Sequence, residues 1–137
     1  MSYGALLSSK LVTEGKFQEA VDAATTEILL HTGDPEPFFN RGMARMGLNQ
    51  VADAITDYER ALTMDARDSA MDPEAVDDEL FFALRTLAGQ RQDDPAAASA
   101  ILRKYAAVLP AGRHLDDIAK WTDKFNGVET VWYRDRA

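Results

Sequence analysis

The sequence predicts an all-α fold built from stacked helix hairpins, and three observations support that prediction. Apolar residues recur with a helical period in the centre of the chain, apolar positions repeat at an offset of about 34 residues, and an Asp-Pro pair precedes three expected helices. The 137 residues, 46% of them hydrophobic, suffice for one domain with a core. We therefore expect residues 1–137 to form a single helical domain.

The clearest hairpin runs from Pro35 to Asp68 and turns at residues 47–50. Its second half places its apolar residues on one helical face: Ala54, Ile55, Tyr58, Ala61 and Leu62. Small residues stand where two helices must approach closely: Gly42, Ala44, Ala54 and Ala61. A hairpin of this size cannot bury its apolar face alone, so it requires neighbours of the same kind.

This stretch resembles a tetratricopeptide (TPR) repeat, because Phe38, Gly42 and the spacing Ala54-x3-Tyr58 match positions of that repeat. The resemblance implies a short right-handed superhelical solenoid of three TPR-like helix hairpins plus a C-terminal capping helix. It also implies that the first helix of each hairpin lines a concave groove, in which a peptide or helix of another protein binds.

Residues 1–34 are expected to form a first repeat. Shifted by 34 residues, apolar positions of the central hairpin coincide with apolar positions here: Val51 with Phe17, Ala54 with Ala20, Ile55 with Val21, Leu62 with Ile28 and Met64 with Leu30. The helices should span about 2–13 and 16–31. The first helix departs from the repeat at Gly4 and Ser8, which is common in terminal repeats.

The third unit is less regular. Residues 69–78 are expected to form an acidic loop that runs into an extension of the next helix, and residues 79–112 a degenerate third repeat with helices at about 73–90 and 95–109. The boundaries rest on the pairs Asp34-Pro35, Asp72-Pro73 and Asp94-Pro95, because Asp favours the N-cap and Pro the first helical position.

Residues 113–127 are expected to form the capping helix, because Leu115, Ile118 and Phe125 form a helical stripe that Asn126-Gly127 ends. Residues 128–137 form an apolar tail. We expect this tail either to fold back on the array or to contribute to a homodimer contact through Trp132 and Tyr133.

Composition excludes several classes of function. There is no cysteine for a disulfide or a thiolate site, and a net charge of −8 disfavours nucleic acid and anionic membrane surfaces. The start of the chain has no secretory-signal pattern, and no stretch is apolar enough for a membrane helix. We expect a cytoplasmic protein.

The sequence offers no catalytic constellation, so we expect no enzyme, no metal and no cofactor. His31 and His114 stand apart from any nucleophile or ligand pattern. The acidic pairs follow no oxygen-ligand loop and are interpreted as solvated helix starts: Asp77-Asp78, Asp93-Asp94 and Asp116-Asp117. Arg41, Arg45 and Arg85 are expected to form ion pairs between repeats, with Asp22, Glu27 or Asp57 as the candidate acceptors for these arginines.

The expected function is a non-catalytic adaptor that binds a partner protein in the concave groove. In the register above, the groove residues are Leu6, Ser9, Phe39, Asn40, Met43, Met46, Leu80, Ala83, Leu84 and Leu87. The set is mostly apolar, and exposed apolar grooves usually mark interaction sites. Two alternatives remain: a small secretion-type TPR chaperone that shields an apolar client segment, and a homo-oligomerisation module that uses the C-terminal tail.

Overall fold

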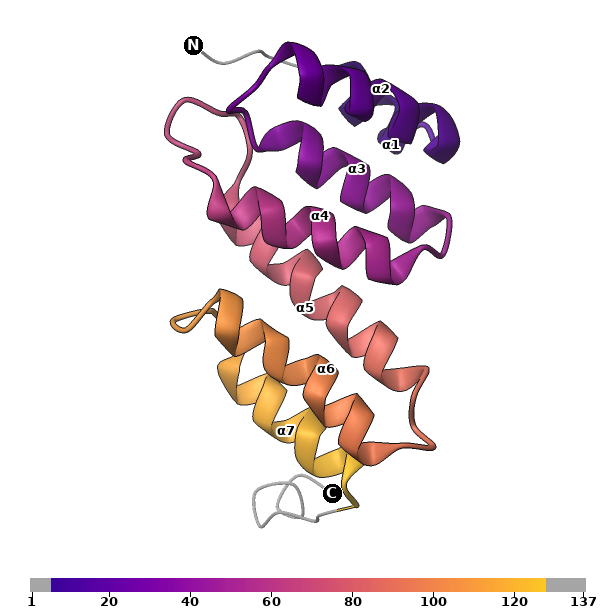
Figure 1. Cartoon of the computed structure of the whole chain (residues 1–137), viewed down its shortest axis with the longest axis vertical. Helices are drawn as coiled ribbons and strands as arrows, with labels where there is room; N and C mark the ends of the chain where they lie inside the picture. Colours follow the sequence, from indigo (N-terminus) through magenta and orange to yellow (C-terminus); the bar gives the residue numbers. More distant parts are fainter. Residues whose placement is uncertain (1–5, 128–137) are drawn as a thin grey trace. The chain divides into compact units, whose positions relative to one another are not determined.

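The computed structural model describes residues 6–127, and this part of the chain consists of helices joined by loops, without a strand, which confirms the predicted all-α class (Figure 1). The described helices are α1 (Leu7–Thr13), α2 (Phe17–Leu30), α3 (Glu36–Gly47), α4 (Val51–Thr63), α5 (Pro73–Gly89), α6 (Pro95–Val108) and α7 (Leu115–Phe125). They divide into two compact units, with the boundary inside α5 between Ala83 and Leu84. Each unit is described by itself below.

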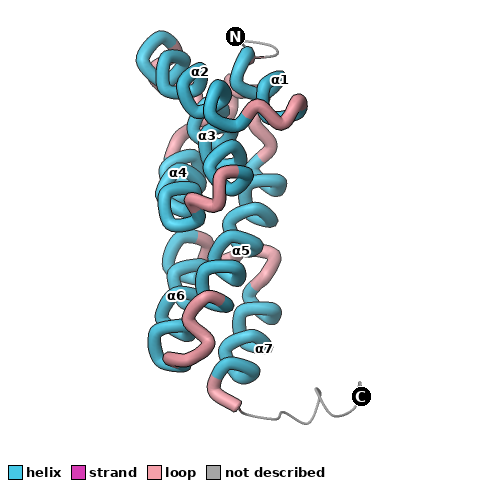
Figure 2. Tube along the Cα trace, turned by 90° about the vertical axis from the view of Figure 1, so that its right-hand side faces the viewer, coloured by secondary structure: helices cyan, strands magenta, loops and turns pink. Residues whose placement is uncertain are grey.

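The first unit is organised by four helices that pack in chain order. α2 packs against both α1 and α3, α3 packs against α4, and α1 also contacts α3 (Figures 1 and 2). Short turns reverse the chain between α1 and α2 and between α3 and α4, so each pair forms an antiparallel hairpin. These turns lie at the positions that the sequence predicts.

The two hairpin turns are equivalent at an offset of 34 residues. Gly15 in the first and Asn49 in the second both adopt a positive φ, of 74° and 60°. In each turn the following backbone N–H donates to the carbonyl five residues earlier, over 2.9 Å in the first turn and 2.8 Å in the second. This is the hydrogen bond by which a left-handed residue closes a helix C-terminus. The sequence offset therefore corresponds to a repeated backbone geometry.

Small residues are buried between the helices of the first unit. A Cβ atom on Gly42 would lie 2.5 Å from the ring of Tyr58, so glycine lets α3 and α4 meet there. Tyr58 itself is fully buried. The alanines with no exposed surface in this unit lie on several helices: Ala20, Ala24, Ala44, Ala54, Ala61 and Ala83. The expected close approach is confirmed at Gly42, and Ala44, Ala54 and Ala61 are completely buried.

All three aspartates of the Asp-Pro pairs accept a backbone N–H at a helix start. Asp34 and Asp72 each accept from the residue two positions on, at 3.0 Å, and Asp94 accepts from the residue three positions on, at 3.1 Å. α5 and α6 begin at the proline as expected, whereas α3 begins at Glu36, one residue after Pro35. The shift of one residue arises because Pro35 itself occupies the cap position of α3.

In the second unit, α6 and α7 pack against each other (Figure 1). Its buried apolar side chains come from the end of α5 and from both of these helices: Leu84, Ala88, Ala98, Leu102, Tyr105 and Ile118. The Tyr105 hydroxyl accepts the backbone N–H of His114 over 2.8 Å, which fixes the loop before α7. Among the described helices, none is both long and apolar enough to cross a membrane.

Candidate partner-binding face

A buried polar network joins the first three helices. Ser8 on α1 donates its backbone N–H to Glu27 Oε2 over 3.1 Å, and its hydroxyl donates to the other oxygen of the same carboxylate. Asn40 on α3 in turn donates its amide to the Ser8 hydroxyl oxygen over 3.0 Å. All three residues are almost completely buried. Because buried polar groups are costly without partners, this network fixes how α3 is rotated against α1 and α2.

A second polar cluster joins α3 to α4. Arg41 donates Nε and Nη2 to the two oxygens of Asp57, over 3.0 and 2.8 Å, and Arg45 donates Nη1 to the same carboxylate over 2.7 Å. The Asp57 side chain is only 3% exposed. The expected arginine ion pair with Asp57 is confirmed, but it lies within one hairpin and not between repeats. The cluster also extends to α2, where Arg41 Nη1 donates to Thr25 Oγ1 over 3.3 Å.

Aromatic rings complete the contact between α3 and α4. The Arg41 guanidinium also lies 5.5 Å from the ring of Phe38, and the guanidinium of Arg60 lies 5.8 Å from the same ring. Phe39 packs against Tyr58 with ring centroids 5.9 Å apart. Burial raises the pKa of the Tyr58 phenol, and the nearby charges of Glu79 and Asp57 raise this pKa further. The Tyr58 hydroxyl thus stays neutral at any physiological pH.

A stripe of side chains runs along the side of α3 that the two polar clusters do not use, although Phe39 within it also packs against Tyr58. Phe39, Met43 and Met46 follow one another at i, i+4 and i+7, so they form a single stripe along the helix. All three are half-buried, and Ser9 on the adjoining helix α1 is half-buried as well. We refer to these four residues as the α1–α3 face. Three of its four side chains are apolar, two of them flexible thioethers.

The ten expected groove residues fall into two classes. Half-buried are Ser9, Phe39, Met43, Met46 and Leu87, and buried in the packing are Leu6, Asn40, Leu80, Ala83 and Leu84. The buried five do not line an open surface in this conformation. Asn40 is buried and donates its amide to Ser8. The three residues of α5, namely Leu80, Ala83 and Leu84, have no exposed surface. Leu87 belongs to the second unit.

Ser8 is the residue whose role the sequence reasoning missed. It stands 34 residues before Gly42, at a position where helices approach closely, and the repeat pattern by itself marks it only as a departure from the repeat. A small hydroxyl at such a position can meet polar partners on two neighbouring helices at once. Glu27 follows Thr25 and Thr26, and Asn40 precedes Arg41, so the neighbouring residues carry no signal that these two polar side chains pair with Ser8.

A concentration of carboxylates lies at the junction of α2 and α3. Asp34 is buried and accepts the Ser69 hydroxyl over 2.6 Å, which ties the loop before α5 to this junction. Burial raises the pKa of the neighbouring Glu36 carboxyl, and the charges of Asp34 and Glu27 raise this pKa further. One carboxylate oxygen of Asp34 and one of Glu36 are buried without a hydrogen-bond partner among the described residues.

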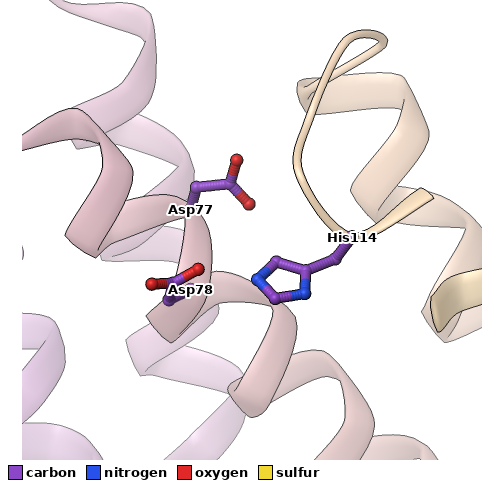
Figure 3. A group of neighbouring side chains, drawn as sticks. All are labelled: Asp77, Asp78 and His114. Carbon is purple, nitrogen blue, oxygen red and sulfur yellow. The ribbon is translucent and has the colours of Figure 1, made fainter. Parts of the chain in front are cut away.

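Two of the three acidic pairs lie at helix starts, whereas Asp77-Asp78 lies inside α5 and Asp77 is buried, so the interpretation as a solvated helix start is wrong for Asp77. Asp77 and Asp78 are neighbours on α5 whose carboxylate oxygens come within 4.8 Å of one another, and the first is buried while the second is exposed (Figure 3). His114 lies just before α7, and its Nδ1 is 2.9 Å from Asp117 Oδ2 in the first turn of that helix. Asp93-Asp94 precede α6, and Asp116-Asp117 lie in the first turn of α7, as helix-start residues would.

The expected tail contact through Trp132 and Tyr133 lies outside the described residues, because the described part ends at residue 127. In comparisons with known proteins, no family model matches the chain and no curated protein matches it. The α1–α3 face is therefore interpreted from its own residues.

Proposed function

We propose that the chain is a non-catalytic protein-interaction module, and that the α1–α3 face binds an apolar peptide or helix of a partner protein. The observation that carries the proposal is the stripe Phe39, Met43 and Met46 on the side of α3 that the polar clusters do not use. A row of side chains at i, i+4 and i+7 fits an apolar partner laid along the helix. Methionine adapts to partners of different shape at low cost.

The proposal includes a TPR-like character for residues 6–68. The contact between Gly42 and Tyr58, the matching turns at Gly15 and Asn49, and the contact between α1 and α3 support it. In such an array the first helices of successive repeats share one face, and partners bind along it. A third repeat formed by α5 and α6 with α7 as its capping helix belongs to the same proposal. A cytoplasmic adaptor without cofactors is the role that fits these features best.

The rigid support of this face favours binding over a purely structural role. Asn40 is held by Ser8, and Arg41 and Arg45 are held by Asp57, so the backbone of α3 is fixed on both sides of the stripe. A pre-organised face avoids part of the ordering cost of association. The partner should therefore lose more conformational freedom than this protein does.

The test compares two double variants in recovery of partners from the native host. Met43→Glu with Met46→Glu places charges in the stripe, and Leu29→Glu with Leu30→Glu makes the same change on α2, where both leucines are more than 70% exposed. We expect the first variant to lose partners that the wild type and the control recover, while all three proteins melt at similar temperatures.

The result that would refute the proposal is equally concrete. If the Met43 and Met46 variant is folded and recovers the same partners as the wild type, the α1–α3 face is not the binding site. If the Leu29 and Leu30 variant loses the same partners, the partners bind exposed apolar residues without preference for the α1–α3 face. Light scattering of each bait before use separates loss of a partner from a change in self-association.

A further inference from the structure

Glu36 stands at the end of the α1–α3 face where α3 begins. It is the first residue of α3, and it precedes Phe39 by three positions and Met43 by seven. Residues at i, i+3 and i+7 of a helix lie on one side of it, so the Glu36 side chain continues the stripe of Phe39 and Met43. Glu36 is half-buried, as these two residues are. The mostly apolar face therefore has a carboxylate at one end.

The Glu36 carboxylate lies in a negative environment. The Asp34 carboxylate accepts the backbone N–H of Glu36 over 3.0 Å, and Asp34 is only 5% exposed. Burial is the main cause that raises the pKa of the Glu36 carboxyl, and the charges of Asp34 and Glu27 add to it, so both lie within electrostatic reach of Glu36. A positive charge beside Glu36 would therefore be attracted by more than one carboxylate.

The described residues provide no cation for this end of the face. Oε2 of Glu36 and Oδ2 of Asp34 are buried without a hydrogen-bond partner, and neither residue takes part in an ion pair within the described part of the chain. Arg41 and Arg45, the two arginines of α3, pair with Asp57 instead. A buried carboxylate oxygen without a partner costs free energy, and a cation from another molecule would offset that cost.

Provided that the α1–α3 face binds a partner as proposed above, we infer that the partner segment is basic as well as apolar: its apolar side chains lie along the face, and a Lys or Arg one turn away pairs with the Glu36 carboxylate. The net charge of −8 favours the encounter with a basic segment. A cation paired with a half-buried carboxylate loses part of its water, so it also selects among apolar segments.

The test first selects peptides that bind. Displayed peptides of about 12 residues have leucine fixed at i, i+4 and i+7 and every other position randomised, and they are selected separately on the wild type and on Glu36→Gln. Glutamine keeps the shape of the glutamate without its charge, so the apolar stripe remains in place. We expect lysine and arginine to be enriched within one turn of a leucine in the wild-type selection only.

A selected peptide and a counterpart with glutamine in place of its basic residue are then compared by fluorescence anisotropy. With the wild type, this replacement should weaken binding by about ten-fold, and added salt should weaken the basic peptide more than its counterpart. With Glu36→Gln, the two peptides should bind alike. The matched control Glu19→Gln removes an exposed carboxylate from the first turn of α2 and should behave like the wild type.

The double variant Met43→Glu with Met46→Glu distinguishes the two ways in which the result can fail. If the selected peptides bind it as tightly as they bind the wild type, or if the wild type selects none, the α1–α3 face is not a binding site and the proposed function fails as well. If the peptides require both methionines but carry no excess of basic residues, the assignment of a basic partner is overturned alone. The same holds if loss of the basic residue weakens binding equally with the wild type and with Glu36→Gln.

Discussion

Removal of the Asp57 carboxylate should destabilise the first unit more than any other single loss of charge in it. In Asp57→Ala, Arg41 and Arg45 lose a shared partner that accepts three of their N–H groups within 3.0 Å. Breaking a buried ion pair by removing one partner costs about 3–5 kcal/mol. The arginine side chains are 17% and 24% exposed and can turn toward water, so we expect a value near the lower end, about 3 kcal/mol.

The assay is urea unfolding followed by helical circular dichroism. For a urea dependence of about 1.5 kcal/mol per molar, a loss of about 3 kcal/mol lowers the midpoint by about 2 M. The matched control is Asp53→Ala, which removes an exposed aspartate from the first turn of the same helix. It should cost less than about 1 kcal/mol, because it removes only a favourable interaction with the helix dipole.

The arginines extend the same argument. Arg41→Met should cost less than Asp57→Ala, because Arg45 still pairs with Asp57 in that variant. The effects of Arg41→Met and Asp57→Ala combined should fall short of their sum, because the two residues share one interaction. If Asp57→Ala unfolds at the same urea concentration as Asp53→Ala, the cluster does not stabilise the α3–α4 contact and our reasoning is wrong.

Three further predictions concern single side chains of the first unit, and each is checked by urea unfolding of the full chain. Gly42→Ala should cost about 1–3 kcal/mol, because its Cβ would lie 2.5 Å from the Tyr58 ring, whereas Gly89→Ala, which meets no atom within 4 Å, should not destabilise; equal effects would contradict the close contact. Tyr58→Phe should leave stability unchanged or raise it slightly, since its buried hydroxyl has no hydrogen-bond partner among the described residues, and a loss above about 1 kcal/mol would reveal a partner. For Glu36, burial and nearby carboxylates raise the pKa of the native carboxyl, so protonation favours the folded state below the unfolded pKa and this advantage is lost as pH rises through the native pKa. Glu36→Gln should therefore be more stable than the wild type near neutral pH, with a difference that shrinks as pH falls; a constant difference would refute the assignment.

The positions of most helices could be predicted from local sequence. Asp-Pro pairs set the starts of α5 and α6, and the offset of 34 residues located both turns of the first unit, because capping and turn conformations depend on a few neighbouring residues. Close packing at Gly42 followed from the absence of a side chain at a helix contact. These are local properties, and short stretches of sequence carry them.

The identity of the exposed residues could not be predicted in the same way. Helical periodicity placed Phe39, Asn40 and Met43 on one face, yet Asn40 turned out to be buried because Ser8, 32 residues earlier, supplies its hydrogen-bond partner. A rotation of the helix by a fraction of a turn decides which neighbouring position faces water. That rotation is fixed by partners on other helices, which periodicity alone does not identify.

The sequence by itself determined that the chain is helical, where its hairpins turn and which positions must be small. The tertiary structure decided that Arg41 and Arg45 pair with Asp57 inside one hairpin, and that Arg85 on α5 and Lys124 on α7 both lie against the ring of Trp121. The physical reason is the range of the interactions. Capping, turn and helix preferences act over a few residues, whereas ion pairs and aromatic contacts join residues that only folding brings together.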